Sequence, residues 1–203
     1  PNKGTDSLRK AIAAYETDRG MACSMDNILV TVGATGALNT ALTGLLNPGD
    51  EVIIPIPAFP LYESIATAAG AVPVFLDLQK SNFQIDKAAL ESVISEKTRA
   101  IVLNSPNNPT GVVLSDESVK ALTSVLSEKE KEYDHPIYII SDEPYRELVY
   151  GVSAPYIPNY YNNTISCYSF SKSLSLPGER IGYICVSKKC DDWSDIFFAV
   201  CGA

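Results

Sequence analysis

Short apolar segments rich in Val, Ile and Leu alternate along the chain with longer segments patterned as helices. Several of the apolar segments are almost continuous, which is typical of strands that are buried on both faces of a sheet. The seven predicted strands are Ile28–Val32, Glu51–Pro55, Val72–Phe75, Ala100–Asn104, Ile137–Ser141, Thr164–Tyr168 and Ile181–Val186. The predicted helical segments are Leu8–Tyr15, Gly36–Leu46, Tyr62–Ala69, Lys87–Ser95 and Ser115–Tyr133.

Repeated strand–helix–strand units predict an α/β fold, in which helices cover both faces of a largely parallel sheet. We therefore expect a three-layer α/β/α sandwich around a mostly parallel sheet of about seven strands. Ligands of such sheets bind beyond the carboxyl ends of the strands, so the segments that follow strands are the places to look for function. Five segments follow strands: Gly33–Thr35, Pro57–Phe59, Asn104–Gly111, Asp142–Tyr145 and Ser169–Lys172.

Both ends of the sequence have the character of internal positions. Pro1 is not preceded by a methionine, and the apolar run Ile196–Val200 lies just before the last residue. An apolar run of this kind normally packs against chain that follows or covers it. We expect the 203 residues to be a piece of a longer protein.

Charge and composition narrow the possible functions. The net charge is −8 and 46% of the residues are hydrophobic, which is typical of a globular domain and disfavours binding to nucleic acid or to an anionic membrane. The single histidine, His135, removes most metal chemistry and is expected to be a surface turn residue. The five cysteines contain no C-x-x-C pair, and no apolar run reaches the roughly 18 residues of a membrane span. These features are typical of a cytoplasmic protein whose thiols are free.

Two of the segments that follow strands contain groups suited to anions. Ala34 and Thr35 lie where small residues and free backbone N–H groups at a helix start attract a phosphate, although a plain tight turn explains them equally well. Asn108 lies between prolines, which hold its amide in a fixed direction; ordinary turn formation remains the alternative.

An acid follows the fifth predicted strand. Asp142 ends an apolar run, and a carboxylate there is costly unless it meets a cation or several donors. Helix or turn capping is one interpretation of Asp142. The other is a carboxylate that faces a protonated nitrogen, with the phenol of Tyr145 nearby.

A lysine follows the sixth predicted strand, and this segment gives the strongest indication of a functional site. Lys172 lies between the hydroxyls of Ser171 and Ser173, and Arg180 comes eight residues later. A desolvated lysine beside other cations becomes a nucleophilic amine, and arginine suits bidentate phosphate binding. A solvated lysine is the plain alternative. Phe59 and Tyr62, in the segment after the second strand, are also explained as core aromatics.

Taken together, these segments resemble the class I/II aminotransferases of the aspartate aminotransferase superfamily, which are fold-type I enzymes dependent on pyridoxal 5′-phosphate (PLP). The resemblance runs over nearly the whole chain. It is carried by five ordered motifs: Leu46–Val52, Pro57–Tyr62, Asn107–Gly111, Ser141–Tyr145 and Ser169–Lys172.

The resemblance implies a role for each candidate residue. Lys172 would form a Schiff base with the cofactor aldehyde and then move the proton between the substrate Cα and the cofactor, while Asp142 would pair with the pyridine nitrogen. Tyr145 and Asn108 would hydrogen-bond the ring 3-oxygen, and Phe59 would stack on the ring. The remaining residues would hold the phosphate: Ala34, Thr35, Ser169 and Arg180, with Ser171 assisting.

The resemblance also implies a domain division and partners. Residues 1–27 would be a helical segment that leads into a PLP-binding large domain at 28–203, truncated before a C-terminal small domain. The substrates would be an amino acid and a 2-oxoacid, and the full-length protein would be a homodimer. Two residues of the family's active site would be missing from this chain: an arginine of the small domain, and a tyrosine just before Pro1 that reaches the cofactor phosphate of the neighbouring subunit. We therefore expect the chain to be a poor aminotransferase by itself.

Three other functions remain open from the sequence. A carbon–sulfur lyase on the same scaffold would share the cofactor contacts. A PLP-sensing regulator domain would be fused to a DNA-binding segment. A generic nucleotide-binding α/β domain would form no lysine adduct.

Overall fold

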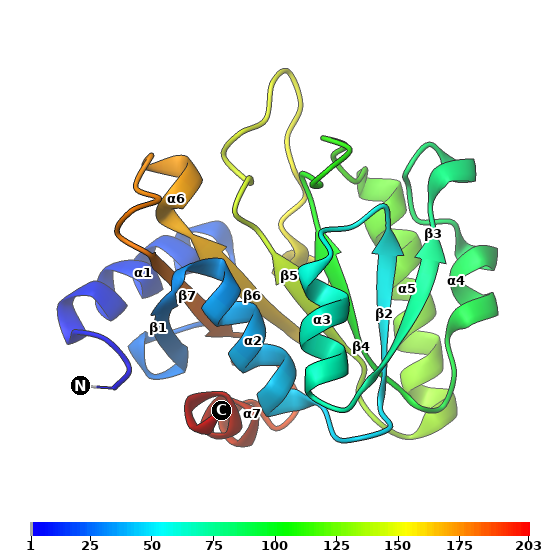
Figure 1. Ribbon diagram of the computed structural model, residues 1–203, viewed down its shortest axis with the longest axis horizontal. Coiled ribbons are helices and arrows are strands. Elements are labelled where there is room, and N and C mark those ends of the chain that lie inside the picture. The colour runs from blue at the N-terminus through cyan, green and yellow to red at the C-terminus, as the bar shows by residue number, and fades with distance from the viewer. Residues whose placement is uncertain (1) are drawn as a thin grey trace.

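The computed structural model describes residues 2–203 and contains one seven-stranded sheet with helices on both faces (Figure 1). The strands are β1 (Ile28–Val32), β2 (Glu51–Ile56), β3 (Val72–Asp77), β4 (Thr98–Asn104), β5 (Tyr138–Asp142), β6 (Thr164–Ser169) and β7 (Ile181–Val186). The α-helices are α1 (Asp6–Arg19), α2 (Gly33–Leu45), α3 (Leu61–Ala68), α4 (Lys87–Val93), α5 (Asp116–Tyr133), α6 (Phe170–Ser173) and α7 (Trp193–Gly202). Three short 3₁₀ turns lie at Met25–Asn27, Gln79–Ser81 and Ile157–Asn159.

The sheet is mostly parallel, as the sequence predicts. Its strand order is β1-β7-β6-β5-β4-β2-β3, and β7 runs antiparallel to both of its neighbours. The other pairs, from β6 through β5, β4 and β2 to β3, are parallel. The carboxyl ends of these five strands therefore lie along one edge of the sheet, the upper edge in Figure 1.

Alternate residues of the strands enter different layers because side chains on a strand point to opposite faces in turn. On β5, Tyr138 and Ile140 pack with α2 and α3, whereas Ile139 packs with the helices of the other face. The first core layer also includes α7, and the second is formed with α4 and α5. A smaller third cluster joins α1 to β1, β6 and β7.

The predicted helices Leu8–Tyr15, Tyr62–Ala69, Lys87–Ser95 and Ser115–Tyr133 are found with ends shifted by up to four residues, and three other differences bear on the site or on the packing. The helix α2 begins at Gly33, so the predicted Gly33–Thr35 loop is instead its first turn. Lys172 lies on the short helix α6 rather than in a loop. The apolar run Ile196–Val200, for which no helix was predicted, belongs to α7, which packs against α2. Among residues 2–203, no helix is long and apolar enough to cross a membrane.

Candidate functional site

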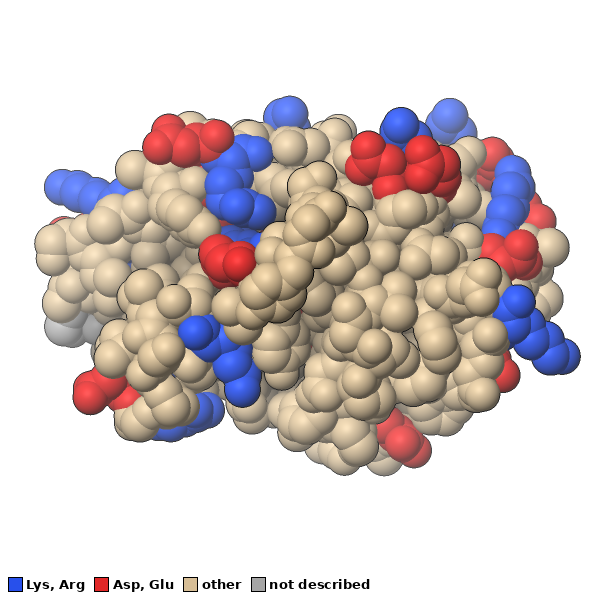
Figure 2. Space-filling model, turned by 90° about the horizontal axis from the view of Figure 1, so that it is seen from above, with Lys and Arg blue, Asp and Glu red and all other residues tan. Residues whose placement is uncertain are grey.

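A cavity of about 350 Å³ lies at the carboxyl edge of the parallel strands. All ten residues that the sequence nominated line it: Ala34, Thr35, Phe59, Asn108, Asp142, Tyr145, Ser169, Ser171, Lys172 and Arg180. Leu38, Tyr62, Asn104, Pro144 and Pro177 complete the lining. Figure 2 views the molecule from this edge and shows charged side chains in the left part of the face and near its upper and right borders, with a broad uncharged area between them.

Asp142 is the most buried charged group of the cavity, with only 4% of its surface exposed. It ends β5, and the parallel register places it beside Asn104 at the end of β4. Its Oδ1 atom has no hydrogen-bond partner among residues 2–203. Burial, together with the charge of Glu143, raises the pKa of this carboxyl to about 7, although a hydrogen bond from Tyr62 opposes the shift. The cavity thus holds a carboxyl that lacks a partner at one oxygen.

Tyr62 on α3 makes a contact that sequence reasoning missed. Its hydroxyl donates to Asp142 Oδ2 at 2.6 Å, and the whole side chain is buried. The helical pattern of Leu61–Ala68 predicts that this position faces the core, and nothing in it indicates a partner 80 residues away. Tyr62 is therefore both a core aromatic and a polar neighbour of the site.

Asn104 also makes contacts that the sequence analysis did not predict. Its Nδ2 atom donates to the backbone oxygen of Asp142 at 2.9 Å, and its Oδ1 accepts from the backbone N–H of Asn108 at 2.7 Å. One side chain therefore fixes two candidate residues relative to each other. A polar residue at the end of the apolar run Thr98–Asn104 was the available signal.

The lysine comes from the end of β6 and the first turn beyond it. Ser169 caps α6 by accepting from the backbone N–H of Ser171 at 3.2 Å, and the same two residues join their hydroxyls at 2.9 Å. The Lys172 Nζ atom lies 5.7 Å from the centre of the Tyr145 ring. Lys172 is exposed while Asp142 is buried, so the cavity has an amine on its solvent side and an acid at its base.

The start of α2 and Arg180 form a basic corner of the cavity. Gly33 has a φ of +67°, and a Cβ atom there would lie 2.8 Å from Arg180 Nη2, so the guanidinium lies over a bare backbone. Among residues 2–203, no side chain caps the start of α2, which leaves the N–H groups of the first turn available to an anion. The corner is thus suited to a phosphate group.

Two aromatic side chains border the opening. The Phe59 ring is 40% exposed and meets the edge of Tyr62, with 6.0 Å between ring centres. Burial and the charge of Asp142 raise the pKa of Tyr145, so its phenol stays protonated and can donate.

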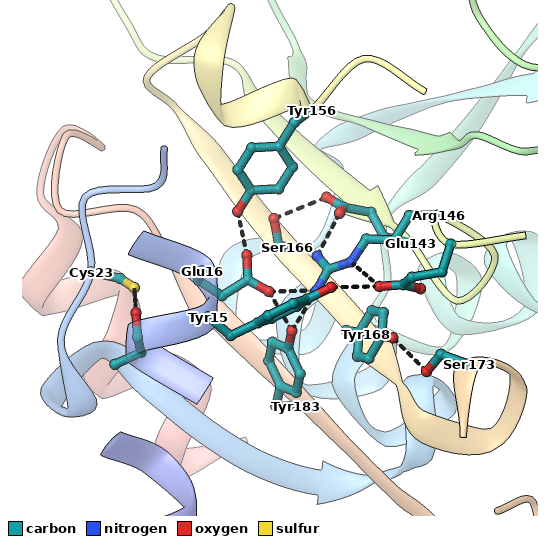
Figure 3. A network of polar contacts seen from close by, with 12 residues as sticks. Tyr15, Glu16, Cys23, Glu143, Arg146, Tyr156, Ser166, Tyr168, Ser173 and Tyr183 are labelled. Carbon is teal, nitrogen blue, oxygen red and sulfur yellow. Dashed lines mark hydrogen bonds and ion pairs between the residues drawn. The ribbon is translucent and has the colours of Figure 1, made fainter. Parts of the chain in front are cut away.

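Behind the site lies a buried polar network that joins α1 to the segment after β5 (Figure 3). Arg146 donates to Glu16 at 2.7 Å and to Glu143 at 2.9 Å, and all three side chains are almost wholly buried. Glu16 also accepts from the hydroxyls of Tyr156 and Tyr183. Glu143 further accepts from Ser166 at 3.1 Å. Asp142 faces the cavity while its neighbour Glu143 faces this network.

His135 does not line the cavity, in agreement with its expected role at a turn. Its ring nitrogens lie within hydrogen-bond distance of the backbone oxygens of Glu96 and Pro136. Within residues 2–203, no group of three or more His, Cys, Asp and Glu side chains is arranged to hold a metal ion.

The amino-acid sequence is similar to those of known aminotransferases. Residues 1–200 match the family model described as aminotransferase class I and II. The aspartate aminotransferase of Musicola paradisiaca is 39% identical over 192 residues, which are 91% of this chain and 46% of that protein. A probable N-acetyl-LL-diaminopimelate aminotransferase of Bacillus subtilis is 35% identical over 93% of this chain and 47% of its own length. The chain spans about half the length of the curated relatives it matches.

Solved structures give the same result for the fold. An aminotransferase from Eubacterium rectale superposes with a TM-score of 0.95 at 45% identity, covering 99% of this chain and 51% of the other. The aspartate aminotransferase of Thermus thermophilus, solved with maleate, superposes with a TM-score of 0.87 at 31% identity, over 100% of this chain and 50% of the other. The mostly parallel α/β architecture is thus the one found in aspartate aminotransferases.

Proposed function

The chain belongs to the class I and II aminotransferases, and on that premise we propose that its cavity binds PLP for the transfer of an amino group from an L-amino acid to a 2-oxoacid. The observation that carries the proposal is Asp142, a buried carboxyl whose Oδ1 lacks a partner within residues 2–203. A protonated pyridine nitrogen is a donor that would satisfy this oxygen.

The residues present fit the cofactor at each of its functional groups. The corner formed by Arg180 and the start of α2 suits its phosphate, and Asp142 suits its ring nitrogen at the base of the cavity. Lys172 supplies an amine in the same cavity. When bound, PLP supplies an aldehyde that condenses with amines and a ring that withdraws electrons from the substrate Cα.

We assign the cavity residues to four tasks. Asp142 would hold a proton on the ring nitrogen, which would favour electron withdrawal. Tyr145 and Asn108 would donate to the ring 3-oxygen, and Phe59 would pack on the face of the ring. The residues around the basic corner would hold the phosphate: Ala34, Thr35, Ser169, Ser171 and Arg180.

Lys172 has two tasks. Its Nζ atom would hold the cofactor aldehyde in the resting protein, and as a free amine it would carry a proton to and from the substrate Cα. The position beside Tyr145 and at the solvent side of the cavity gives substrate access to this amine.

The organisation of the complete protein follows from the same proposal. Residues 1–27 lead into a cofactor domain at 28–203, and a small domain and a second subunit complete the substrate side. The relatives are named for different amino donors, and aspartate is the first donor to test because it recurs in their names. The five free cysteines favour the cytoplasm.

Covalent trapping tests cofactor binding directly. The 203-residue chain is incubated with PLP, reduced with borohydride and digested, and we expect mass spectrometry to locate the phosphopyridoxyl group on Lys172. Lys172→Ala should abolish both the adduct and the visible absorbance of the Schiff base. The matched control is Lys120→Ala, an exposed lysine on α5, which should leave both unchanged. Modification spread over several lysines at wild-type level in Lys172→Ala would refute the proposal.

Amino transfer and carbon–sulfur elimination are separated by product. The relatives reported above are named aminotransferases, which favours amino transfer. We expect 2-oxoacid-dependent loss of the donor amino group from L-aspartate, at a low rate because the chain spans about half the length of its relatives. Release of thiol and pyruvate from a cysteine conjugate in place of amino exchange would favour the lyase.

A further inference from the structure

We propose that Tyr62 is a positioning residue that occupies one oxygen of Asp142 and so directs the other toward the ring nitrogen of the cofactor. The inference rests on the proposed function and concerns a side chain that the cofactor itself does not need to touch.

The two oxygens of Asp142 have different surroundings. Oδ2 accepts from the Tyr62 hydroxyl at 2.6 Å, and Oδ1 has no partner among residues 2–203. The backbone oxygen of the same residue is held by Asn104 Nδ2 at 2.9 Å. With backbone and Oδ2 both fixed, the carboxyl cannot rotate without breaking the Tyr62 hydrogen bond, so Oδ1 keeps one direction in the cavity.

The phenol of Tyr62 is a fixed donor. Burial and the negative charge of Asp142 raise its pKa, so the hydroxyl stays protonated across the physiological range. Its proton stabilises the ionised form of Asp142, which burial and Glu143 both disfavour. Tyr62 therefore favours the charge as well as the orientation that a pyridinium needs.

The other titratable groups around Asp142 do not duplicate the hydrogen bond from Tyr62. The titratable side chains near it are Tyr62 from α3, Glu143 and Tyr145 from the end of β5 and beyond, and Cys167 from β6, with Lys172 and Arg180 elsewhere on the cavity lining. Of these, Tyr62 is the one that donates a hydrogen bond to the Asp142 carboxylate. A purely structural Tyr62 would need only its ring, which meets Phe59 edge-on and lies in the apolar core.

The variant Tyr62→Phe separates the hydroxyl from the ring. The first measurement is the pKa of the Asp142 carboxyl in the cofactor-free chain, which is monitored by NMR of the labelled carboxyl carbon. We expect the pKa to rise by about one unit in Tyr62→Phe, because the carboxylate loses a buried donor. The second measurement is the PLP dissociation constant as a function of pH. As the pH is lowered, we expect the variant to lose PLP affinity at a pH about one unit higher than wild type does. Below the Asp142 pKa, the variant should therefore bind PLP about tenfold more weakly than wild type.

The matched control is Tyr138→Phe. Tyr138 lies on the same strand as Asp142 and in the same core layer as Tyr62. Its hydroxyl lies 3.4 Å from the backbone oxygen of Asp191, outside the cavity lining, so both measurements should stay at the wild-type values. Urea unfolding of both variants checks that the fold is retained.

The outcomes divide cleanly. An unchanged Asp142 pKa in Tyr62→Phe overturns the proposal, and so does a raised pKa that leaves cofactor affinity unaltered at every pH. Wild-type chain that binds no PLP at any pH overturns the proposed function, and it is recognised because the failure does not depend on residue 62. A parallel change in both quantities, absent from Tyr138→Phe, supports the proposal.

Discussion

At the scale of single residues, the end of β5 gives two adjacent acids opposite surroundings. Asp142 points into the cavity and has a pKa raised to about 7 by burial, whereas Glu143 is paired with Arg146 at 2.9 Å. The folded chain keeps the Asp142 proton up to about pH 7, while the unfolded chain releases it near the ordinary value of 3.8. Between these values the folded state binds more protons, so the free energy of unfolding falls as the pH rises. A group suited to a cofactor thus destabilises the cofactor-free protein at neutral pH.

Asp142→Asn removes this cost and keeps an oxygen that can accept from Tyr62. We compare the free energies of unfolding of the cofactor-free variant and of cofactor-free wild type. We expect the difference in favour of the variant to grow by about 2 kcal/mol between about pH 5.5 and about pH 8. Urea unfolding followed by circular dichroism at the two pH values measures this difference. The exposed Asp18→Asn on α1 is the control and should change little. An equal effect of Asp142→Asn at both pH values would contradict the assignment of a raised pKa.

At the scale of elements, α1 is fastened to the cavity segment by ionic and phenolic contacts rather than by apolar packing alone. Glu16 accepts from Arg146, Tyr156 and Tyr183. Burial and the charge of Glu16 raise the pKa of both phenols, so both remain donors. Since Arg146 follows Tyr145 directly, the network holds the segment that carries a cavity residue.

Glu16→Gln keeps the shape of this side chain but leaves Arg146 with less compensating charge. We expect a loss of about 3 kcal/mol in the free energy of unfolding, because the removal of one partner leaves a buried charge unbalanced. Urea unfolding of Glu132→Gln is the control. Glu132 is exposed and its pair with Lys129 lies at the surface, so it should change stability by less than about 0.5 kcal/mol. Comparable losses in the free energy of unfolding of the two variants would show that burial does not determine how much the Glu16–Arg146 pair contributes to stability.

Most elements follow from the sequence because long strands and helices carry their own periodicity. The bounds of β1 and β7 are as predicted, and the other strands agree within one or two residues. The short helix α6 is four residues long and has no period to detect. The helix α7 is apolar on several sides, with Phe198 81% exposed, so no amphipathic pattern marks it.

Contacts between distant segments are what the sequence could not provide. The ten nominated residues line one cavity, but their roles in binding a cofactor remain a prediction. The contacts of Tyr62 and Asn104 were missed because their partners come from other elements, and a helical or strand pattern indicates burial without identifying a neighbour. The insertion of β7 between β1 and β6 likewise depends on tertiary packing.

At the scale of the whole molecule, the cavity is assembled from segments that span residues 34 to 180. A ligand that bridges them binds the folded state alone and therefore stabilises it by mass action. The basic corner of Arg180 and α2 contributes only when the ligand carries an anion.

We expect PLP to stabilise the chain by about 3 kcal/mol at a hundredfold excess over its dissociation constant, which raises Tm by about 5–10 °C. Pyridoxal, which lacks the phosphate, should raise Tm much less at the same concentration. Arg180→Ala should remove most of the difference between the two compounds. Thermal unfolding followed by circular dichroism tests this, and equal shifts with PLP and pyridoxal would place the phosphate elsewhere.

The antiparallel pairing of β1 with β7 also bears on how the protein is made. At a synthesis rate of roughly 5–20 residues per second, β1 leaves the ribosome on the order of ten seconds before its sheet neighbour. During that interval an early strand of Ile, Leu and Val residues lacks that neighbour and is exposed to chaperones or to other nascent chains. Because Arg180 immediately precedes β7, a translation product that stalls before Ile181–Val186 is complete lacks the strand that joins β1 to β6, and its Arg180 is not yet held at the start of α2.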